Sequence, residues 1–350
     1  MGKNKNYKLI RLIEQSIKDF KLDLTDYNIL LPVSLIEPAL APVMASLAGA
    51  ANIYVPARDI ETVNKTSFFI NELDLKNRIV FIEKENPQIL SKLDIVIKGD
   101  GVSYIDSEFI SQLNENCIIS MFPKNFDFTN IEGVDLKGCA QRKIPVIAVD
   151  PDDKNLMLNK YFAHLVIKRC FQADLNILNS RILLVGSGEL METILSLLKT
   201  MGAVVYAAYT DKPQDQLYIL KHLHEAEIVI VADYPQKSEL VIGNNGFINI
   251  GDLADINPEA RIVHISGRME INPLAFNRVF YTPEVITQNS LNVNAGNIGI
   301  KALSDVTAAI MKVAQTLIKS RNRSLLPGES LLSYNIINAE GPVILGKINF

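Results

Sequence analysis

Short apolar runs alternate with stretches of helical spacing along most of the chain, and this alternation constrains the fold more than any other feature. Six runs in the first half have the length and composition of β-strands: 28–31, 53–55, 79–82, 94–97, 118–121 and 146–149. A second series follows at 181–186, 204–209, 227–232, 261–266 and 278–283. Strands separated by helices form parallel β-α-β units whose sheet is covered on both faces. The sequence therefore predicts an α/β protein.

A short polar joint at residues 174–180 separates the two series and predicts two domains. We expect residues 1–165 to form an open, flavodoxin-like substrate domain. Residues 175–297 are predicted to form a Rossmann-like, doubly wound parallel sheet that binds a nucleotide. A long helix over about 300–319 follows, and the tail behind it has the composition of turns and loops. The segment 300–350 is a candidate to complete the first domain.

Charge and composition argue against a nucleic-acid partner and against a membrane-spanning segment. The 35 basic and 39 acidic residues give a net charge of −4 with no long run of one sign, so no nucleic-acid partner is expected. The longest stretch of small uncharged residues, 39–51, is too short to span a membrane, which needs about 20 apolar residues. Cys117, Cys139 and Cys170 are too scattered for a disulfide framework or a zinc site. Cys117 begins an apolar strand and is predicted to be a core thiol, whereas Cys139 and Cys170 lack a neighbouring base and are not expected to be nucleophiles. A cytoplasmic protein is expected.

Three of the four histidines have neighbours that allow an interpretation. His264 lies inside an apolar strand, where a hydrogen-bonded core histidine is expected. His222 and His224 lie in the helical stretch KHLHEAE and are predicted to occupy a helix surface without forming a metal site.

A glycine turn follows the first strand of the second series. The strand RILLV runs directly into Gly186-Ser187-Gly188, and a helix is predicted from Glu189. Gly186 allows a tight turn, and Gly188 lets a pyrophosphate approach the helix N-terminus, where free N–H groups favour anions. We therefore predict that residues 186–190, which end at Leu190, bind a cofactor. Met191 replaces the third glycine of the usual pattern, so a turn that holds no dinucleotide stays an alternative.

The next strand ends without the carboxylate that usually binds a ribose 2′-hydroxyl. Tyr209 stands at this position, and Asp211 follows two residues later. Tyr209 is suited to pack beside an adenine or a ribose. Lys212 would suit a 2′-phosphate, or it is an ordinary exposed lysine.

Parallel strands bring their carboxyl ends to one edge of the sheet, where ligands of such folds bind. We therefore predict that Asp233, Ser266 and Gly267 join the glycine turn in the cofactor site. The tract at 292–299 is rich in asparagine and glycine and precedes the long helix. Its Asn294 either lines the same cleft or helps to cap that helix.

The segment KIPVIAVDPDDKNLMLNKYF (143–162) resembles a segment of the S-adenosylhomocysteine hydrolases. Lys154, Asn159 and Tyr161 match a lysine, an asparagine and a tyrosine of that family, and the order of elements over about 28–315 also agrees. The resemblance implies a bound NAD that oxidises a ribose hydroxyl, a lysine that helps to activate that hydroxyl, and a homo-oligomer. It also implies a catalytic position for Glu37, which matches a glutamate of the family.

Several proton-transfer groups of that family are missing from this sequence. The loop at 31–34 has no histidine, and Leu158 replaces the aspartate beside the matching asparagine. Asp100 lies near a family aspartate but out of register, and Arg268 stands where the family has a histidine. Hydrolysis of S-adenosylhomocysteine at a useful rate is therefore not expected.

The glycine turn and the resemblance together favour a nicotinamide-dependent enzyme. It would use NAD or NADP in a redox or elimination reaction on a small polar substrate. Lys154, Asn159 and Glu37 are its predicted catalytic residues. One alternative is a transferase or regulator that binds S-adenosylmethionine, S-adenosylhomocysteine or a nucleotide without redox chemistry. Another is a 2-hydroxy or amino acid dehydrogenase, because D-2-hydroxyacid dehydrogenases, dipicolinate synthase and alanine dehydrogenase have a similar architecture. No histidine follows Arg268 to supply the usual dehydrogenase base.

Overall fold

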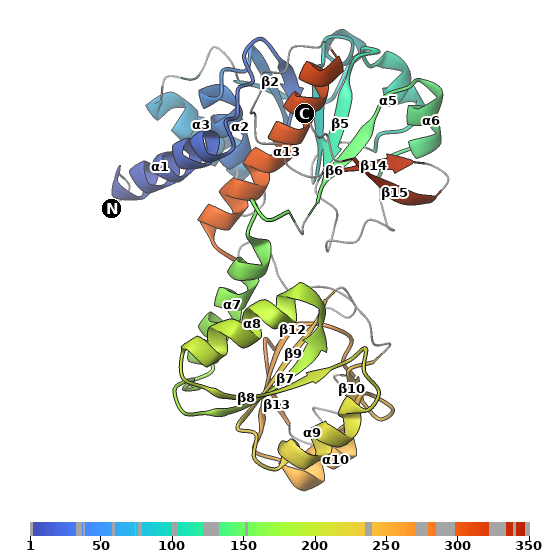
Figure 1. The fold of residues 1–350 in the computed structure, drawn as a ribbon. Helices are drawn as coiled ribbons and strands as arrows, with labels where there is room; N and C mark the ends of the chain where they lie inside the picture. The colour runs from blue at the N-terminus through green and yellow to red at the C-terminus, as the bar shows by residue number, and fades with distance from the viewer. Residues whose placement is uncertain are drawn as a thin grey trace. The chain divides into compact units, whose positions relative to one another are not determined.

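The computed structural model of the protein describes residues 3–32, 37, 39–57, 60–73, 75, 79–99, 102, 104–121, 133–150, 153–234, 240–270, 279–284, 298–321, 334–338 and 341–346. The chain divides into two compact units (Figure 1). The first unit comprises Met1–Leu156 and Gly299–Phe350, and the second comprises Met157–Ile298. The predicted end of the first domain at residue 165 therefore falls inside a helix of the second unit, and the segment from Gly299 belongs to the first unit.

The first unit is built on one sheet of eight strands. These are β1 (Asn28–Leu30), β2 (Asn52–Pro56), β3 (Ile79–Ile82), β4 (Ile95–Lys98), β5 (Ile118–Met121), β6 (Val146–Val149), β14 (Tyr334–Asn338) and β15 (Gly341–Gly346). Their order across the sheet is β15-β14-β6-β5-β4-β1-β2-β3. The six strands from β6 to β3 are parallel, and each was predicted from its apolar run.

The tail was predicted to be turns and loops, and this prediction is wrong for its described residues, 334–338 and 341–346, which form two strands. The segment LLPGES at 325–330, on which the prediction also rested, lies outside the described residues. β14 pairs antiparallel with β6, and β15 pairs antiparallel with β14. Without this hairpin the backbone groups of β6 would have no strand beside them on that side, so the pairing continues the sheet. Asn338 and Gly341 are themselves strand residues and pair with each other across this hairpin.

Seven helices of the described residues belong to the first unit: α1 (Lys3–Asp19), α2 (Leu40–Leu47), α3 (Ile60–Glu72), α4 (Pro87–Leu90), α5 (Ser107–Gln112), α6 (Leu136–Gln141) and α13 (Ile300–Arg321). α13 lies along the sheet beside α1 (Figure 1). The Ser16 hydroxyl of α1 donates to Asp305 of α13 over 2.7 Å, in a buried contact between the two helices. Within the described ranges, no helix has the length and apolar character needed to cross a membrane.

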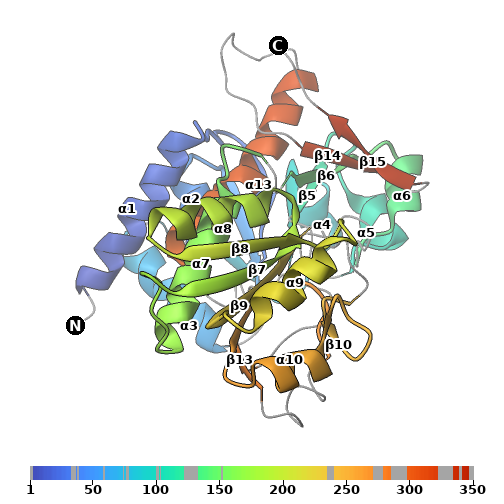
Figure 2. The same ribbon diagram turned by 60° about the horizontal axis from the view of Figure 1, so that its bottom comes forward.

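The second unit has a five-stranded parallel sheet and a small parallel pair. Its strands are β7 (Arg181–Ser187), β8 (Val204–Tyr209), β9 (Ile228–Asp233), β12 (Arg261–Ser266), β13 (Phe280–Thr282) and the pair β10 (Ile242–Gly243) and β11 (Ile248–Asn249). The large sheet has the order β13-β12-β9-β7-β8. Helices α7 (Leu158–Gln172) and α8 (Gly188–Thr200) cover one face, and α9 (Asp215–Leu223) and α10 (Ile250–Ile256) cover the other (Figures 1 and 2).

The predicted α/β class with doubly wound parallel sheets is confirmed. Numbered along the chain, the six parallel strands of the first unit have the order 3-2-1-4-5-6. This is the Rossmann order, so the flavodoxin-like topology expected for this unit, 2-1-3-4-5, is corrected. The large sheet of the second unit has the order 2-1-3-4-5, and its strand order reverses between β7 and β9. Ligands of open α/β sheets bind outside the carboxyl ends of the strands at such a reversal.

The three cysteines are core thiols, which confirms the prediction made for Cys117. Cys117, Cys139 and Cys170 are all buried and unpaired with one another. Burial raises the pKa of each thiol, to about 12 for Cys139 and Cys170, so the thiols stay protonated at neutral pH. A protonated buried thiol is a poor nucleophile.

Candidate functional site

The glycine turn lies at the reversal point of the second sheet. β7 ends at Ser187, and α8 begins at Gly188. A Cβ atom on Gly186 would lie 2.0 Å from the carbonyl oxygen of Ala232 on β9, so the two strands leave no room for a side chain. Gly188 has φ +70°, a left-handed conformation that favours glycine. Close packing therefore requires glycine at position 186, and the backbone conformation favours it at position 188.

A buried carboxylate joins the last residues of β7 and β9 to the residue that follows β8. Asp233, at the end of β9, is paired in register with Ser187 of β7. Its Oδ1 atom accepts hydrogen bonds from the hydroxyls of Ser187 and Thr210, each over 2.6 Å. All three side chains are buried. Thr210 was not among the predicted residues, although a hydroxyl directly after a strand at this edge is a signal that could have found it.

The hydroxyl of Ser187 is therefore not used to cap α8. Ser187 is the N-cap residue of this helix, a position at which a serine often accepts from the first N–H groups. Its side chain makes no such bond here. The start of α8 is thus left without a side-chain cap from Ser187, which is the arrangement needed where a ligand binds the helix N-terminus.

The end of β12 is held by a neutral histidine. The His264 Nε2 atom lies 2.7 Å from the carbonyl oxygen of Gly267, which has φ +105°. Burial lowers the pKa of His264 to about 4, so at neutral pH the ring is uncharged and its Nε2–H donates to this carbonyl. Arg169 of α7 donates to the carbonyl oxygen of His264. The prediction that His264 is a hydrogen-bonded core residue is confirmed.

Ser266 is a buried hydroxyl at the same edge. It pairs with Ala232 of β9, which pairs in turn with Gly186 of β7. The Ser266 Oγ atom has no hydrogen-bond partner among the described residues. Buried polar atoms without a partner are uncommon in folded proteins and can mark the place of a bound molecule.

Tyr209 is held by three contacts at the end of β8. Its hydroxyl donates to Glu192 Oε1 of α8 over 2.7 Å, and its backbone N–H donates to Asp215 Oδ2 over 2.9 Å. The Lys212 ammonium lies 3.9 Å from the centre of the ring. The bond to Glu192, followed by burial and neighbouring negative charge, raises the pKa of Tyr209 to about 12. Glu192 was not predicted, because a helix-surface glutamate has no distinguishing sequence pattern.

The structure brings seven of the predicted cofactor residues to one edge of the second sheet: Gly186, Ser187, Gly188, Tyr209, Asp233, Ser266 and Gly267. The other predicted residues are less closely associated with this edge. Glu189 and Asp211 are exposed, whereas Leu190 is buried in α8. Asn294 lies outside the described residues.

The three predicted catalytic residues belong to different units. Glu37 is half-buried and Lys154 is exposed, and both belong to the first unit. Asn159 is half-buried in the first turn of α7, in the second unit. Their participation in one site stays a prediction.

The described residues contain no group of three His, Cys, Asp or Glu side chains that could hold a metal ion. His224 is exposed, but the surface position expected for His222 is wrong. The His222 ring stacks on Tyr206 with centroids 4.0 Å apart and also contacts Tyr218. Only 13% of its side chain is exposed, because two aromatic rings enclose it.

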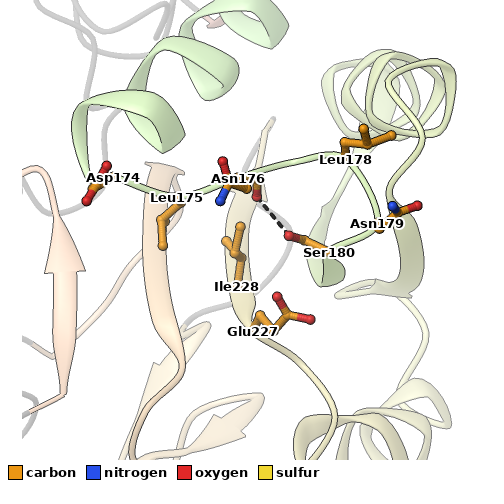
Figure 3. A pocket seen from close by; sticks show the side chains of 8 residues that line it. All are labelled: Asp174, Leu175, Asn176, Leu178, Asn179, Ser180, Glu227 and Ile228. Carbon is orange, nitrogen blue, oxygen red and sulfur yellow. Dashed lines mark hydrogen bonds between the residues drawn. The ribbon is translucent and has the colours of Figure 1, made fainter.

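A cavity of about 440 Å³ lies at the opposite edge of the sheet (Figure 3). Its lining comes from the joint before β7 and from the start of β9, including Asn176, Ser180 and Glu227. The Ser180 hydroxyl donates to the carbonyl oxygen of Asn176 over 2.9 Å. Because these residues lie at the amino ends of the strands, the cavity is separate from the edge that carries the glycine turn.

Comparison with known families of sequences gives no match. Comparison with curated proteins gives no match either. Solved structures do resemble the chain. The A chain of dipicolinate synthase from Bacillus subtilis has a TM-score of 0.58 and 13% identity, covering 86% of this chain and 99% of that one. The pyruvate reductase of Chlamydomonas reinhardtii has a TM-score of 0.51 and 11% identity, covering 85% and 98%. The chain is therefore similar to these two proteins in its fold.

Proposed function

We propose that the protein is a nicotinamide-dependent enzyme whose second unit binds the dinucleotide at the edge formed by the ends of β7, β8, β9 and β12. The observation that carries this proposal is the turn of Gly186 and Gly188 at the reversal point of the sheet. A backbone without side chains at this point lets a pyrophosphate approach the start of a helix. The fold shared with dipicolinate synthase and pyruvate reductase supports the same assignment.

The residues around the turn fit a bound dinucleotide in two further respects. Asp233 fixes the loops after β7 and β8 through Ser187 and Thr210, which keeps the binding edge rigid before a ligand arrives. Ser266 offers a buried hydroxyl that has no partner among the described residues. When bound, the nicotinamide would supply hydride transfer, while the chain orients it and excludes water.

The reaction that we favour is a redox or redox-assisted elimination on a small polar substrate, as the resemblance to S-adenosylhomocysteine hydrolases suggests. Leu158 cannot take part in proton transfer, and general acid–base groups typically contribute about 10²–10⁴-fold each. Purified protein should therefore release no homocysteine from S-adenosylhomocysteine at an ordinary enzymatic rate. Such release would overturn this part of the proposal.

The carboxylate of Glu189 favours a second candidate function, the binding of a ligand that has no phosphate. Glu189 lies in the first turn of α8, beside the place where a pyrophosphate would bind. A carboxylate there opposes a phosphate and suits a ligand without phosphates, such as S-adenosylmethionine. On this alternative the protein is a transferase or regulator rather than an oxidoreductase. The fold shared with pyruvate reductase also keeps a 2-hydroxy acid dehydrogenase among the candidates.

The test is to identify the ligand. Mass spectrometry of small molecules released from denatured protein, together with absorbance near 340 nm, separates a nicotinamide from an adenosyl ligand. Calorimetric titration with NAD, NADP, S-adenosylmethionine and S-adenosylhomocysteine then measures affinity. Gly188→Val should abolish binding and leave the fold intact. Failure of every one of these ligands to bind wild-type protein would overturn the proposal.

Gly202→Val is the matched control. Gly202 also has positive φ, at +83°, but it precedes β8 at the opposite edge of the sheet. Both variants place a branched side chain in the same backbone region and carry a comparable conformational cost. Only Gly188→Val should remove ligand affinity.

A further inference from the structure

The carboxylate that the sequence lacks at the end of β8 is supplied by another element. In dinucleotide-binding folds an acidic residue about 20 residues after the glycine turn binds the ribose 2′-hydroxyl. Tyr209 occupies that position, 21 residues after Gly188. Its hydroxyl donates to Glu192 of α8 over 2.7 Å, so a carboxylate lies at this end of β8 in spite of the substitution.

Glu192 is exposed on α8, and the Tyr209 hydroxyl holds its carboxylate. Glu192 lies one helical turn after Gly188, on the helix that begins at the glycine turn. The backbone of Tyr209 is anchored by the bond from its N–H to Asp215, and its phenol lies beside α8 through the hydroxyl bond to Glu192. The pair Tyr209–Glu192 thus links the end of the second strand to the helix that the cofactor would approach.

The electrostatic environment at this point is negative. The pKa of the Tyr209 hydroxyl is raised to about 12, first by its bond to Glu192 and by burial, and further by the charges of Glu192, Asp215 and Asp211. These carboxylates disfavour a negative phenolate. They would also disfavour a phosphate dianion in the same place.

Two lysine side chains near Tyr209 or Glu192 partly offset the negative charge of these carboxylates. Lys212 is placed over the Tyr209 ring, 3.9 Å from its centre. Lys160 lines a groove of about 510 Å³ together with Glu189 and Glu192. The carboxylates that act on the Tyr209 hydroxyl are those of Glu192, Asp215 and Asp211, and they outnumber the two ammonium groups, so the charge balance near Tyr209 opposes an added anion.

We infer that Glu192, held by Tyr209, is a specificity-determining residue that admits an adenosine ribose with a free 2′-hydroxyl and excludes one with a 2′-phosphate. The ligand class is accordingly NAD or another adenosine nucleotide without a 2′-phosphate. This inference rests on the proposed function, because it concerns the same dinucleotide site. It also replaces the sequence-based interpretation of Lys212 as a 2′-phosphate residue.

The test compares two probes that differ only at this position, ADP-ribose and ADP-ribose 2′-phosphate. Calorimetry at low ionic strength, where charge effects are least screened, gives the ratio of their dissociation constants. Wild-type protein should bind ADP-ribose at least about tenfold more tightly, and Glu192→Gln should reduce this ratio to about threefold or less. Tyr209→Phe should reduce it partly, because Glu192 loses the group that holds it.

Glu225→Gln is the matched control. Tyr206, on the same strand as Tyr209, donates its hydroxyl to Glu225 over 3.0 Å. Removing this second tyrosine-bonded carboxylate should leave the ratio unchanged, and circular dichroism should show that both glutamine variants are folded.

The outcomes separate the two proposals. A wild-type ratio near one, a ratio that Glu192→Gln leaves unchanged, or an equal change in Glu225→Gln would each overturn the specificity inference. In each of these cases the probes still bind, so the proposed function stands. If neither probe binds wild-type protein, the proposed function fails and the inference fails with it.

Discussion

The Ser187 hydroxyl donates to Asp233 Oδ1 over 2.6 Å, between neighbouring strands β7 and β9. These residues are 46 positions apart in the chain, and both are buried. Ser187 is the middle residue of the glycine turn, so the bond joins this turn to the end of β9 at the reversal point of the sheet. Thr210 donates to the same oxygen, so one carboxylate links the ends of β7 and β9 to the residue that follows β8.

Asp233→Ala should destabilise the second unit. The substitution removes two hydrogen bonds to a buried carboxylate, and a hydrogen bond to a charged group contributes about 1.5–3 kcal/mol. The Thr210 hydroxyl keeps the carbonyl oxygen of Gly186, at 3.2 Å, as an acceptor. Asp233→Asn keeps one carbonyl oxygen and should cost less. Urea unfolding monitored by circular dichroism gives both free energies. The exposed Asp211→Ala is the control and should change the free energy of unfolding by less than about 0.5 kcal/mol. An Asp233→Ala variant as stable as wild type would contradict this account.

Gly186→Ala should be more disruptive than an ordinary glycine substitution. Its Cβ would lie 2.0 Å from the carbonyl oxygen of Ala232, so β7 and β9 must separate, at a cost of about 3 kcal/mol or more. Gly251→Ala is the control, since its Cβ meets only a side-chain oxygen of Asn249 at 3.0 Å. Thermal unfolding of both variants measures the difference. Equal melting temperatures would show that the strands can move apart freely.

His264 should make the stability depend on pH. Its folded pKa, about 4, lies below the ordinary value of 6.5, so the unfolded chain binds the proton more readily. The contribution of the neutral ring is therefore complete above about pH 6.5 and is lost as the pH falls towards 4, up to about 3 kcal/mol. His264→Gln should flatten this part of the profile of unfolding free energy. The exposed His224→Gln should leave the profile unchanged, and a wild-type profile without this slope would refute the assignment.

Lys154→Met tests the residue taken from the family resemblance. Lys154 is exposed in the first unit, and an exposed ion pair contributes only about 0–1 kcal/mol to stability. If Lys154 acts on the substrate, the variant should lose most of kcat while its melting temperature hardly changes. The comparison is made on the reaction identified with the bound cofactor, with the exposed Lys168→Met as the control. Full activity of Lys154→Met would remove this residue from the site.

Much of the fold could be predicted from the sequence because its signals are local. The runs at 79–82, 118–121 and 146–149 become β3, β5 and β6 with the predicted bounds. An apolar run between helices must be covered on both faces, so each run identifies a strand of a parallel sheet without knowledge of its neighbours. The glycine turn could be predicted in the same way, because the apolar strand before it and the helical stretch after it are adjacent to it in the chain.

The order of the strands and the contacts at the edge depend on tertiary structure. Glu192 and Tyr209 are 17 residues apart, Thr210 and Asp233 are 23 apart, and Ser187 and Asp233 are 46 apart. The two pairs with Asp233 meet because β7 lies between β8 and β9 in the sheet, and Glu192 meets Tyr209 because α8 packs against β8. The pairing of β14 with β6 likewise joins residues far apart in the chain. The sequence by itself determined the elements and the glycine turn through local periodicity, whereas the packing of α8 against β8 in the tertiary structure decided which carboxylate reaches Tyr209.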